Sequence, residues 1–345
     1  MPRLPPSLFW RARHISPGAA LLLPVCRDFP SALAELRWIR EHVKEKSRGR
    51  LDWEGRERIL SLCRRRGRGE PLQYVLGTQP FGSLDLLCRR GVLIPRPEPE
   101  AYSLHLADLL LRESKQSGGS HKSLTILDAC TGTGCIALLL YAQLQRKMKA
   151  ADSLHVVGID LAPQAVSLSR KNAVRNRLLS AGDSTSIKFV QCDVFSDDWL
   201  DHQDIKRLYQ SPLDILVSNP PYISVDGFSH DTARSVRIFE PKLAQVPLPR
   251  GPGSEVDEDI FYVRLLELAT RMDARIVLCE VGRLAQAERV VGLALNKGPL
   301  LNAEIWADHP DIVDVDCTNR SVTVAGREVP IKGSGHGRSV FIRRR

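Results

Sequence analysis

The chain has 345 residues, of which 43% are hydrophobic and 26% are charged, and its formal net charge is +9. These values are typical of a globular protein with room for one large domain and a smaller one. No apolar run approaches the roughly 18 residues that a membrane-spanning helix needs, which argues against an integral membrane protein. The eight cysteines include no Cys-x-x-Cys pair, so we expect neither a disulfide framework nor a metal site.

The N-terminal part of the chain carries most of the positive charge. Residues 1–100 contain 19 Lys and Arg against 11 Asp and Glu, a net charge of +8. This suggests an acidic or RNA-rich partner, with solvated helix faces as the alternative. Residues 1–27 contain four arginines and no acidic residue, the composition of an organellar transit peptide. We predict a mitochondrial transit peptide over residues 1–27. If this segment is only a basic tail, a cytoplasmic location is expected.

A small helical domain is predicted over residues 28–70. Apolar residues recur there at spacings of three and four from about Ser31, and a second helical pattern covers residues 52–66. Residues 71–100 are predicted to form a hairpin and a connector. The hairpin is expected to use residues 81–87 and 92–94, and residues 95–100 are expected to be a stiff, non-helical connector because they contain three prolines.

The third predicted domain covers residues 101–345. A helix is expected over about residues 101–112, and from Leu124 apolar strands alternate with helices. This alternation is typical of α/β proteins with a doubly wound, mostly parallel, Rossmann-like sheet. The predicted strands cover 124–128, 154–160, 187–191, 213–218 and 276–281, and the predicted helices cover 135–145, 164–176 and 284–295. Residues 304–306 and 340–342 are expected to close the sheet, separated by a polar excursion.

A glycine-containing loop follows the first strand of this domain, with the sequence Asp128-Ala129-Cys130-Thr131-Gly132-Thr133-Gly134. The glycines let the backbone approach a ligand, and the following helix presents its electropositive N-terminus. The third glycine of the dinucleotide fingerprint and the lysine of a P-loop are both missing. Asp128 can accept from an ammonium group, which a ligand derived from methionine has and a dinucleotide lacks.

Two further carboxylates end the neighbouring strands. Asp160 can accept from both ribose hydroxyls of a nucleoside, and Asp193 can accept from an adenine amino group while Val194 packs against the ring. A solvated strand end is the alternative for Asp160, and a helix cap is the alternative for Asp193. Because the carboxyl ends of parallel strands share one edge of a sheet, we predict that these residues and the glycine loop form one ligand site. A glycine loop after a strand fits dinucleotides as well as S-adenosylmethionine, and Asp128 favours a ligand derived from methionine.

The strand over residues 213–218 ends in Asn219-Pro220-Pro221-Tyr222. The prolines fix the backbone and remove two N–H donors, so carbonyl acceptors are left without competing donors. Asn219 adds a carboxamide oxygen and Tyr222 adds a flat face. We call residues 219–222 the mouth of the site. Their acceptors fit a planar –NH2 group, which is held by its two hydrogens while its nitrogen attacks an electrophile. We therefore predict a methyltransferase that acts on an amide or amino nitrogen.

The complete pattern resembles the class I S-adenosylmethionine-dependent methyltransferases that act on amino nitrogens. Further motifs are similar to those of the release-factor glutamine methyltransferase family, in its bacterial and mitochondrial branch with an N-terminal helical domain. These motifs are Pro71-x-Gln73-Tyr74-x-x-Gly77, Val92-Leu93-Ile94-Pro95-Arg96-Pro97-Glu98-x-Glu100 and Phe239-Glu240-Pro241-x-x-Ala244. The resemblance covers about residues 30–345. Cys130 departs from it, because the family usually has glycine there.

The resemblance implies S-adenosylmethionine-dependent N5-methylation of the glutamine in the Gly-Gly-Gln motif of a class 1 peptide release factor. It implies that residues 28–70 dock the release factor, and that neither a membrane nor a nucleic acid is bound directly as substrate. The implied catalytic residues are Asn219, Pro220 and Tyr222. The implied substrate-binding residues are these three with Pro221, Arg96 and Glu98. The implied cofactor-binding residues are Asp128, Cys130, Thr131, Gly132, Thr133, Gly134, Asp160, Asp193, Val194 and Asn219.

Three alternatives stay open at this point. A glutamine methyltransferase that acts on a ribosomal protein shares nearly every motif. An adenine-N6 methyltransferase of nucleic acid would flip its base into the same mouth, although no separate target-recognition domain is evident. A non-catalytic binding module is the third, and the intact segment 219–222 argues against it.

Overall fold

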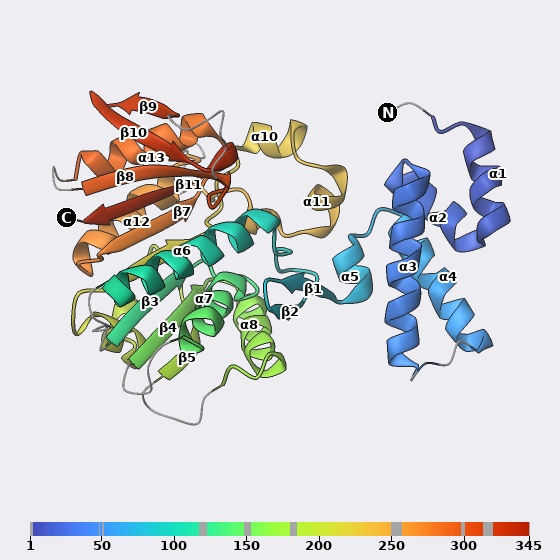
Figure 1. The fold of residues 1–345 in the computed structure, drawn as a ribbon, viewed down its shortest axis with the longest axis horizontal. Coiled ribbons are helices and arrows are strands. Elements are labelled where there is room, and N and C mark those ends of the chain that lie inside the picture. The colour runs from blue at the N-terminus through green and yellow to red at the C-terminus, as the bar shows by residue number, and fades with distance from the viewer. Residues whose placement is uncertain are drawn as a thin grey trace. The chain divides into compact units, whose positions relative to one another are not determined.

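The structure is a computed structural model that describes residues 3–47, 49, 52–116, 123–147, 153–179, 185–249, 257–297, 301–312 and 320–344. The chain divides into two compact units (Figure 1). The helical unit comprises residues 1–78, 88–90 and 232–240, and the sheet unit comprises residues 79–87, 91–231 and 241–345. Within the described residues, no helix is both long and apolar enough to cross a membrane.

The helical unit is held together by apolar faces of its helices. Its elements are α1 (Pro6–Ile15), α2 (Pro17–Cys26), α3 (Phe29–Lys46), α4 (Trp53–Gly67), α5 (Leu72–Leu76) and α11 (Arg234–Phe239). The carboxylate of Asp28 accepts the N–H of Ser31 at 2.8 Å, and that of Asp52 accepts the N–H of Gly55 at 2.9 Å. These bonds cap α3 and α4 and explain where both helices begin.

The segment predicted as a transit peptide, residues 1–27, includes part of this hydrophobic core. Leu22 and Leu23 of α2 are completely buried. α2 also lies so close to α4 that a Cβ on Gly67 would come within 2.2 Å of the carbonyl oxygen of Leu21. A leader ending at residue 27 would remove α2 and expose the apolar faces of α3 and α4. The transit peptide stays a prediction, whereas α2 belongs to the fold of the helical unit.

A short hairpin introduces the sheet unit. Its strands are β1 (Thr78–Phe81) and β2 (Leu84–Leu87). The predicted pairing of residues 81–87 with 92–94 is wrong, because the chain already turns at Gly82, whose φ of +54° suits glycine. Residues 92–94 contribute no strand and instead line a cavity.

The described part of the sheet unit contains a nine-stranded sheet in the order β5-β4-β3-β6-β7-β11-β8-β10-β9 (Figure 1). Strands β3 to β7 are parallel, and β11 is antiparallel to both β7 and β8. The strand bounds are β3 (Ser123–Ala129), β4 (Ser153–Asp160), β5 (Thr185–Gln191), β6 (Ile215–Ser218), β7 (Ile276–Glu280), β8 (Leu301–His309), β9 (Ser321–Val324), β10 (Arg327–Lys332) and β11 (Ser334–Arg344). The predicted doubly wound, mostly parallel sheet is confirmed.

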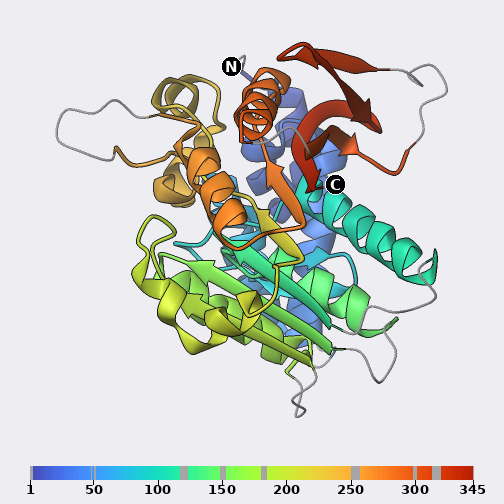
Figure 2. The same ribbon diagram turned by 90° about the vertical axis from the view of Figure 1, so that its left-hand side faces the viewer.

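Helices cover both faces of the sheet (Figure 2). One face packs against α6 (Pro97–Gln116), α7 (Cys135–Gln145) and α8 (Pro163–Arg175), and the other packs against α12 (Ile260–Arg271) and α13 (Leu284–Leu295). Along β3, Ile126 faces the first set and Leu127 faces the second, as the alternation of a strand requires. The shorter elements of this unit are η1 (Asp198–Asp201), α9 (Gln203–Lys206), η2 (Arg207–Tyr209), α10 (Val225–His230) and η3 (Lys242–Ala244).

Two predicted boundaries of the sheet unit are wrong. α6 begins at Pro97 and not near residue 101, because the N–H groups of a first helical turn have no partner within the helix and proline is tolerated there. The polar segment before residue 340 supplies two strands. β10 runs parallel to β8, with Ile331 opposite Ile305, so this segment extends the sheet.

Candidate active site

A cavity lies at the carboxyl ends of β3, β4, β5 and β6. It is lined by the loop after β3 and by the segments that follow the other three strands. Residues 91–96, Pro99, Phe261 and four residues of the segment 241–248 complete the described lining. All of its described lining residues belong to the sheet unit. The strand order reverses beside β3, and open α/β sheets bind ligands at such a switch point. This cavity is therefore the candidate active site.

The two glycines of the loop after β3 have different roles. Both have positive φ, +56° for Gly132 and +80° for Gly134. A Cβ on Gly132 would have no atom within 4 Å, so this residue borders open space, as the approach of a ligand requires. A Cβ on Gly134 would come within 2.9 Å of the Ser169 side chain and 3.1 Å of the Phe189 ring. Gly134 therefore allows α7 to pack closely.

Cys130 also has a positive φ, +59°, although it is not glycine. A side chain in this conformation costs on the order of 1 kcal/mol. Its position, like those of Thr131, Gly132 and Thr133, is on the wall of the cavity. The backbone geometry explains why glycine would be suited to this position.

Asp128 holds the same loop in place through hydrogen bonds to its carboxylate. Its carboxylate is completely buried and accepts through Oδ2 from the Thr131 hydroxyl at 2.6 Å and from the Ala137 N–H at 3.2 Å. Its Oδ1 has no hydrogen-bond partner among the described residues. Burial raises the pKa of Asp128 to about 7. A cation at Oδ1 would satisfy this orphaned acceptor.

Asp160 at the end of β4 ties two backbone segments together. Its Oδ2 accepts the N–H of Gly132 at 2.8 Å, and its Oδ1 accepts the N–H of Ala162 at 2.9 Å. Burial raises the pKa of this carboxyl group. A carboxylate offers about four acceptor positions, so two remain for ligand hydroxyls. The sequence predicted only the ligand role and missed the structural one.

Asp193 and Val194 follow β5, and both line the cavity. The carboxylate of Asp193 accepts the N–H of Phe195 at 3.0 Å, which closes a tight turn after the strand. Val194 is buried. This contact caps a turn and not a helix, so it differs from the helix cap considered as the alternative.

The segment 219–222 borders the cavity at the end of β6. The Ser218 hydroxyl donates to the Ala129 carbonyl oxygen at 2.8 Å. This bond fixes the last residue of β6 beside the last residue of β3. Asn219 and Pro221 line the cavity, whereas Pro220 and Tyr222 are not among its described lining residues. No described residue hydrogen-bonds to the Asn219 carboxamide, which is therefore available to a ligand.

Of the two residues predicted from the segment 95–100, Arg96 lines the cavity. Glu98 lies in the first turn of α6 and is not among the described lining residues. It does lie close enough to Tyr222 and Glu280 to raise the pKa of both groups in part through its charge.

Glu280 is a residue that the sequence reasoning missed. It ends β7 with 3% exposure, and it accepts hydrogen bonds from the hydroxyls of Tyr222 at 3.0 Å and Tyr102 at 3.1 Å. Burial raises its pKa to about 8. The signal in the sequence was a carboxylate at the end of the apolar run Ile276–Cys279, but its partners are remote in the chain.

Comparison with known proteins decides the family. The family described as N-6 DNA Methylase matches residues 99–250. The mitochondrial MRF1 N(5)-glutamine methyltransferase MTQ1 of Saccharomyces cerevisiae is 37% identical over 249 residues, which cover 71% of this chain and 68% of that protein. The probable MRF1 mitochondrial N(5)-glutamine methyltransferase mtq1 of Schizosaccharomyces pombe is 34% identical over 309 residues, which cover 85% of this chain and 90% of that protein. The chain belongs to the release factor glutamine methyltransferase family.

A bacterial relative extends this similarity. The release factor glutamine methyltransferase of Haemophilus influenzae is 33% identical over 220 residues, which cover 61% of this chain and 68% of that protein. The family uses S-adenosylmethionine, and the cavity fits this cofactor. The open space at Gly132 admits a ligand against the backbone, and the orphaned Oδ1 of Asp128 is an acceptor of the kind that an ammonium group needs. Asp128 and Gly134 themselves are not among the described residues that line the cavity.

Proposed function

We propose that this protein transfers the methyl group of S-adenosylmethionine to the side-chain amide nitrogen of the glutamine in the Gly-Gly-Gln motif of a class 1 peptide release factor. One observation carries the proposal. The segment Asn219-Pro220-Pro221-Tyr222 borders the same cavity as the glycine loop and the strand-end carboxylates Asp160 and Asp193. The names of the related proteins support this choice, since the two yeast names give N(5) of glutamine as the position and the Haemophilus influenzae name gives a release factor.

The residues of the cavity divide into groups that would hold different parts of the cofactor. Asp160 would accept from the ribose hydroxyls, and Asp193 would accept from the adenine amino group beside Val194. Asp128 and the loop 130–134 would hold the methionine part. When bound, the cofactor supplies an electrophilic methyl group on a sulfonium centre.

The segment 219–222 would hold and orient the glutamine amide. An amide nitrogen is a poor nucleophile because its lone pair is delocalised into the carbonyl group. The Asn219 side-chain oxygen and the Pro220 carbonyl oxygen would accept its two hydrogens, which favours positive charge on nitrogen as the new N–C bond forms and the C–S bond breaks. Their geometry would aim the lone pair, so the rate gain comes from positioning and electrostatics. The surplus N–H proton passes to water after the transfer.

A mitochondrial release factor is the substrate that we favour. Two relatives bear the word mitochondrial in their names, and residues 1–27 have the composition of a transit peptide. The helical unit would dock the factor, because its excess of Lys and Arg suits an acidic surface.

Cofactor affinity is expected to rise about fivefold as pH increases from about 6 to 7, because only the ionised form of Asp128 attracts an ammonium group and the amino group of the cofactor is still protonated there. The stability of the ligand-free protein should change in the opposite direction. The folded pKa of about 7 lies above the ordinary value, so the folded state binds more protons between about pH 4 and 7. The free energy of unfolding therefore falls as pH rises through this window.

Calorimetric titration with S-adenosylmethionine across this pH range measures the effect. Methylthioadenosine, which lacks the ammonium group, is the matched control and should bind with little pH dependence. Asp128→Asn should flatten both the affinity profile and the stability profile. Equal pH slopes for the two ligands would contradict the assignment of Asp128.

The proposed function is tested by methyl transfer from labelled S-adenosylmethionine to a mitochondrial release factor. The factor is used in its natural form and with the glutamine of its Gly-Gly-Gln motif replaced by alanine. Label on the natural form alone is the expected result, and it identifies both the protein and the acceptor atom. Mitochondrial ribosomal proteins and an adenine-containing RNA are assayed in parallel. Label on either of these, with none on the release factor, would overturn the proposed substrate.

A further inference from the structure

We propose that residues 280–286, a turn that runs from the last residue of β7 into the first turn of α13, are a template that positions Tyr222 and through it the whole mouth 219–222. Three residues of this turn, Glu280, Gly282 and Gln286, contact three different parts of Tyr222. They would act on the reaction as positioning residues, without touching substrate or cofactor. The consequence for catalysis rests on the proposed function, whereas the positioning of Tyr222 can be tested without it.

The first contact is at the hydroxyl group. Tyr222 Oη donates to Glu280 Oε1 at 3.0 Å, and Tyr102 Oη donates to Glu280 Oε2 at 3.1 Å. The main-chain oxygen of Glu280 accepts from Tyr262 Oη at 2.8 Å. Since three tyrosine hydroxyls converge on this nearly inaccessible residue, the carboxylate has little freedom to move. It therefore defines where the end of the Tyr222 side chain can lie.

The second contact is at the ring. A Cβ on Gly282 would lie 3.1 Å from Cδ2 and 3.2 Å from Cε2 of Tyr222. Both separations are shorter than ordinary carbon contacts, so the ring packs directly against the glycine backbone. Any side chain at this position would have to displace the ring.

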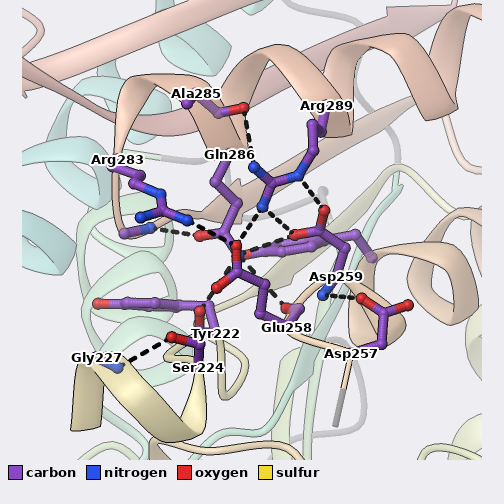
Figure 3. Close-up of polar contacts among 12 residues, drawn as sticks. Tyr222, Ser224, Gly227, Asp257, Glu258, Asp259, Arg283, Ala285, Gln286 and Arg289 are labelled. Atoms are coloured by element: carbon purple, nitrogen blue, oxygen red, sulfur yellow. Dashed lines mark hydrogen bonds and ion pairs between the residues drawn. The ribbon is translucent and has the colours of Figure 1, made fainter. Parts of the chain in front are cut away.

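The third contact is at the main chain of the mouth. Gln286 Nε2 donates to the Tyr222 carbonyl oxygen at 3.3 Å, while Gln286 Oε1 accepts the N–H of Gly282 at 2.9 Å (Figure 3). The same Nε2 also donates to Asp259 Oδ1 at 3.0 Å. Gln286 is 1% exposed, so these bonds are made away from water. One side chain thus connects the mouth, the turn and the start of α12.

The turn itself is braced from both sides, which makes it rigid enough to act as a template. On one side, the main-chain oxygen of Arg338 in β11 accepts the N–H of Val281 at 2.8 Å. The Nη1 atom of the same arginine donates to the Gly282 carbonyl oxygen at 2.7 Å. On the other, Arg283 of the turn pairs with Glu258 at 3.0 Å, and Arg289 farther along α13 pairs with both Asp259 and Glu258 (Figure 3). The turn therefore holds Tyr222 at its hydroxyl, its ring and its carbonyl group.

A double-mutant cycle tests the contact at the hydroxyl. Glu280→Leu and Tyr222→Phe should each lower kcat about tenfold, and the double variant should lower it no further, because both remove the same hydrogen bond. Glu280→Gln keeps one acceptor oxygen for two tyrosine hydroxyls, so it should recover only part of the rate. Tyr102→Phe is the matched control, because Glu280 then keeps its hydrogen bonds from Tyr222 and Tyr262, and kcat should stay within about twofold. Additive losses in the double variant would overturn the proposal.

A second measurement does not depend on activity. The six tyrosines are replaced by 3-fluorotyrosine, and the fluorine resonance of Tyr222 is assigned by its loss in Tyr222→Phe. We expect one narrow resonance in the natural sequence and in Tyr102→Phe, and a shifted or broadened one in Gly282→Ala and Glu280→Gln. A Tyr222 resonance that is unchanged in both of the latter variants would overturn the template.

The two experiments separate the two proposals. If the natural protein labels no release factor while Gly282→Ala and Glu280→Gln alter the Tyr222 resonance, the proposed function fails and the template stands. If the release factor is labelled but the resonance is unchanged, only the template fails. Thermal unfolding of each variant shows whether it is folded, and the conservative pair Glu280→Gln and Gly282→Ala decides the matter should Glu280→Leu not fold.

Discussion

Replacing Asn219 with alanine is expected to lower kcat for methyl transfer by about 10² to 10³-fold, the cost of removing one preorganised polar group from a transition state. The Asn219 carboxamide borders the cavity and has no hydrogen-bond partner among the described residues, so the loss of its oxygen leaves one N–H of the substrate amide unheld. The nitrogen would then lose both orientation and charge stabilisation.

Single-turnover kinetics with labelled cofactor would measure this effect, and equilibrium binding of S-adenosylmethionine would be measured beside it. The dissociation constant should rise by no more than about fivefold, because Asn219 is one of many residues at the site. Asn296→Ala is the matched control, since this asparagine is exposed at the end of α13. Full methyl transfer by Asn219→Ala would contradict the proposed mechanism.

The second large effect is expected at Asp160, where alanine should weaken S-adenosylmethionine binding by about 100-fold or more. The carboxylate accepts the N–H groups of Gly132 and Ala162, and each such charge-assisted bond is worth about 1.5–3 kcal/mol. Alanine would release both segments and would also remove the proposed acceptors of the ribose hydroxyls. The loss should therefore appear in cofactor affinity, whichever methyl acceptor is used.

Isothermal titration with S-adenosylmethionine would measure this loss. Asp160→Asn retains one acceptor oxygen and should lie between the natural protein and the alanine variant. Asp201→Ala is a control of the same chemistry, because this carboxylate is 84% exposed and pairs only with Lys206 among the described residues. An affinity within about threefold of normal in a folded Asp160→Ala protein would exclude this role.

Most of the sheet could be predicted from local patterns. The helices predicted over residues 135–145 and 284–295 have the same bounds as α7 and α13, and the predicted strands differ from β3, β4 and β5 by at most two residues. These elements are apolar segments bounded by glycine, proline or polar residues, so the pattern reports burial directly. α12 had no such prediction, and the start of α6 was hidden by prolines that a first helical turn tolerates.

The N-terminal segment shows how composition can conceal packing. The arginines and missing acids of residues 1–27 predicted a leader, yet the run Leu21–Leu23 lies in α2, and Leu22 and Leu23 belong to the core of the helical unit. A composition argument averages over a segment and does not consider which side chains share a helix face. Contact with α3 and α4 provides that information.

The sequence by itself determined the family, the class of sheet and the edge of the sheet at which we propose that the chemistry lies. Strand-end residues of a parallel sheet converge whatever their separation along the chain, so Asp128, Asp160, Asp193 and Asn219 could be grouped without coordinates. Only the tertiary structure decided how these groups are held. Tyr222 meets Glu280 at a separation of 58 residues, and Asp160 meets Gly132 at a separation of 28. Such contacts depend on the register of strands and on the course of buried turns, which no local pattern of residues encodes.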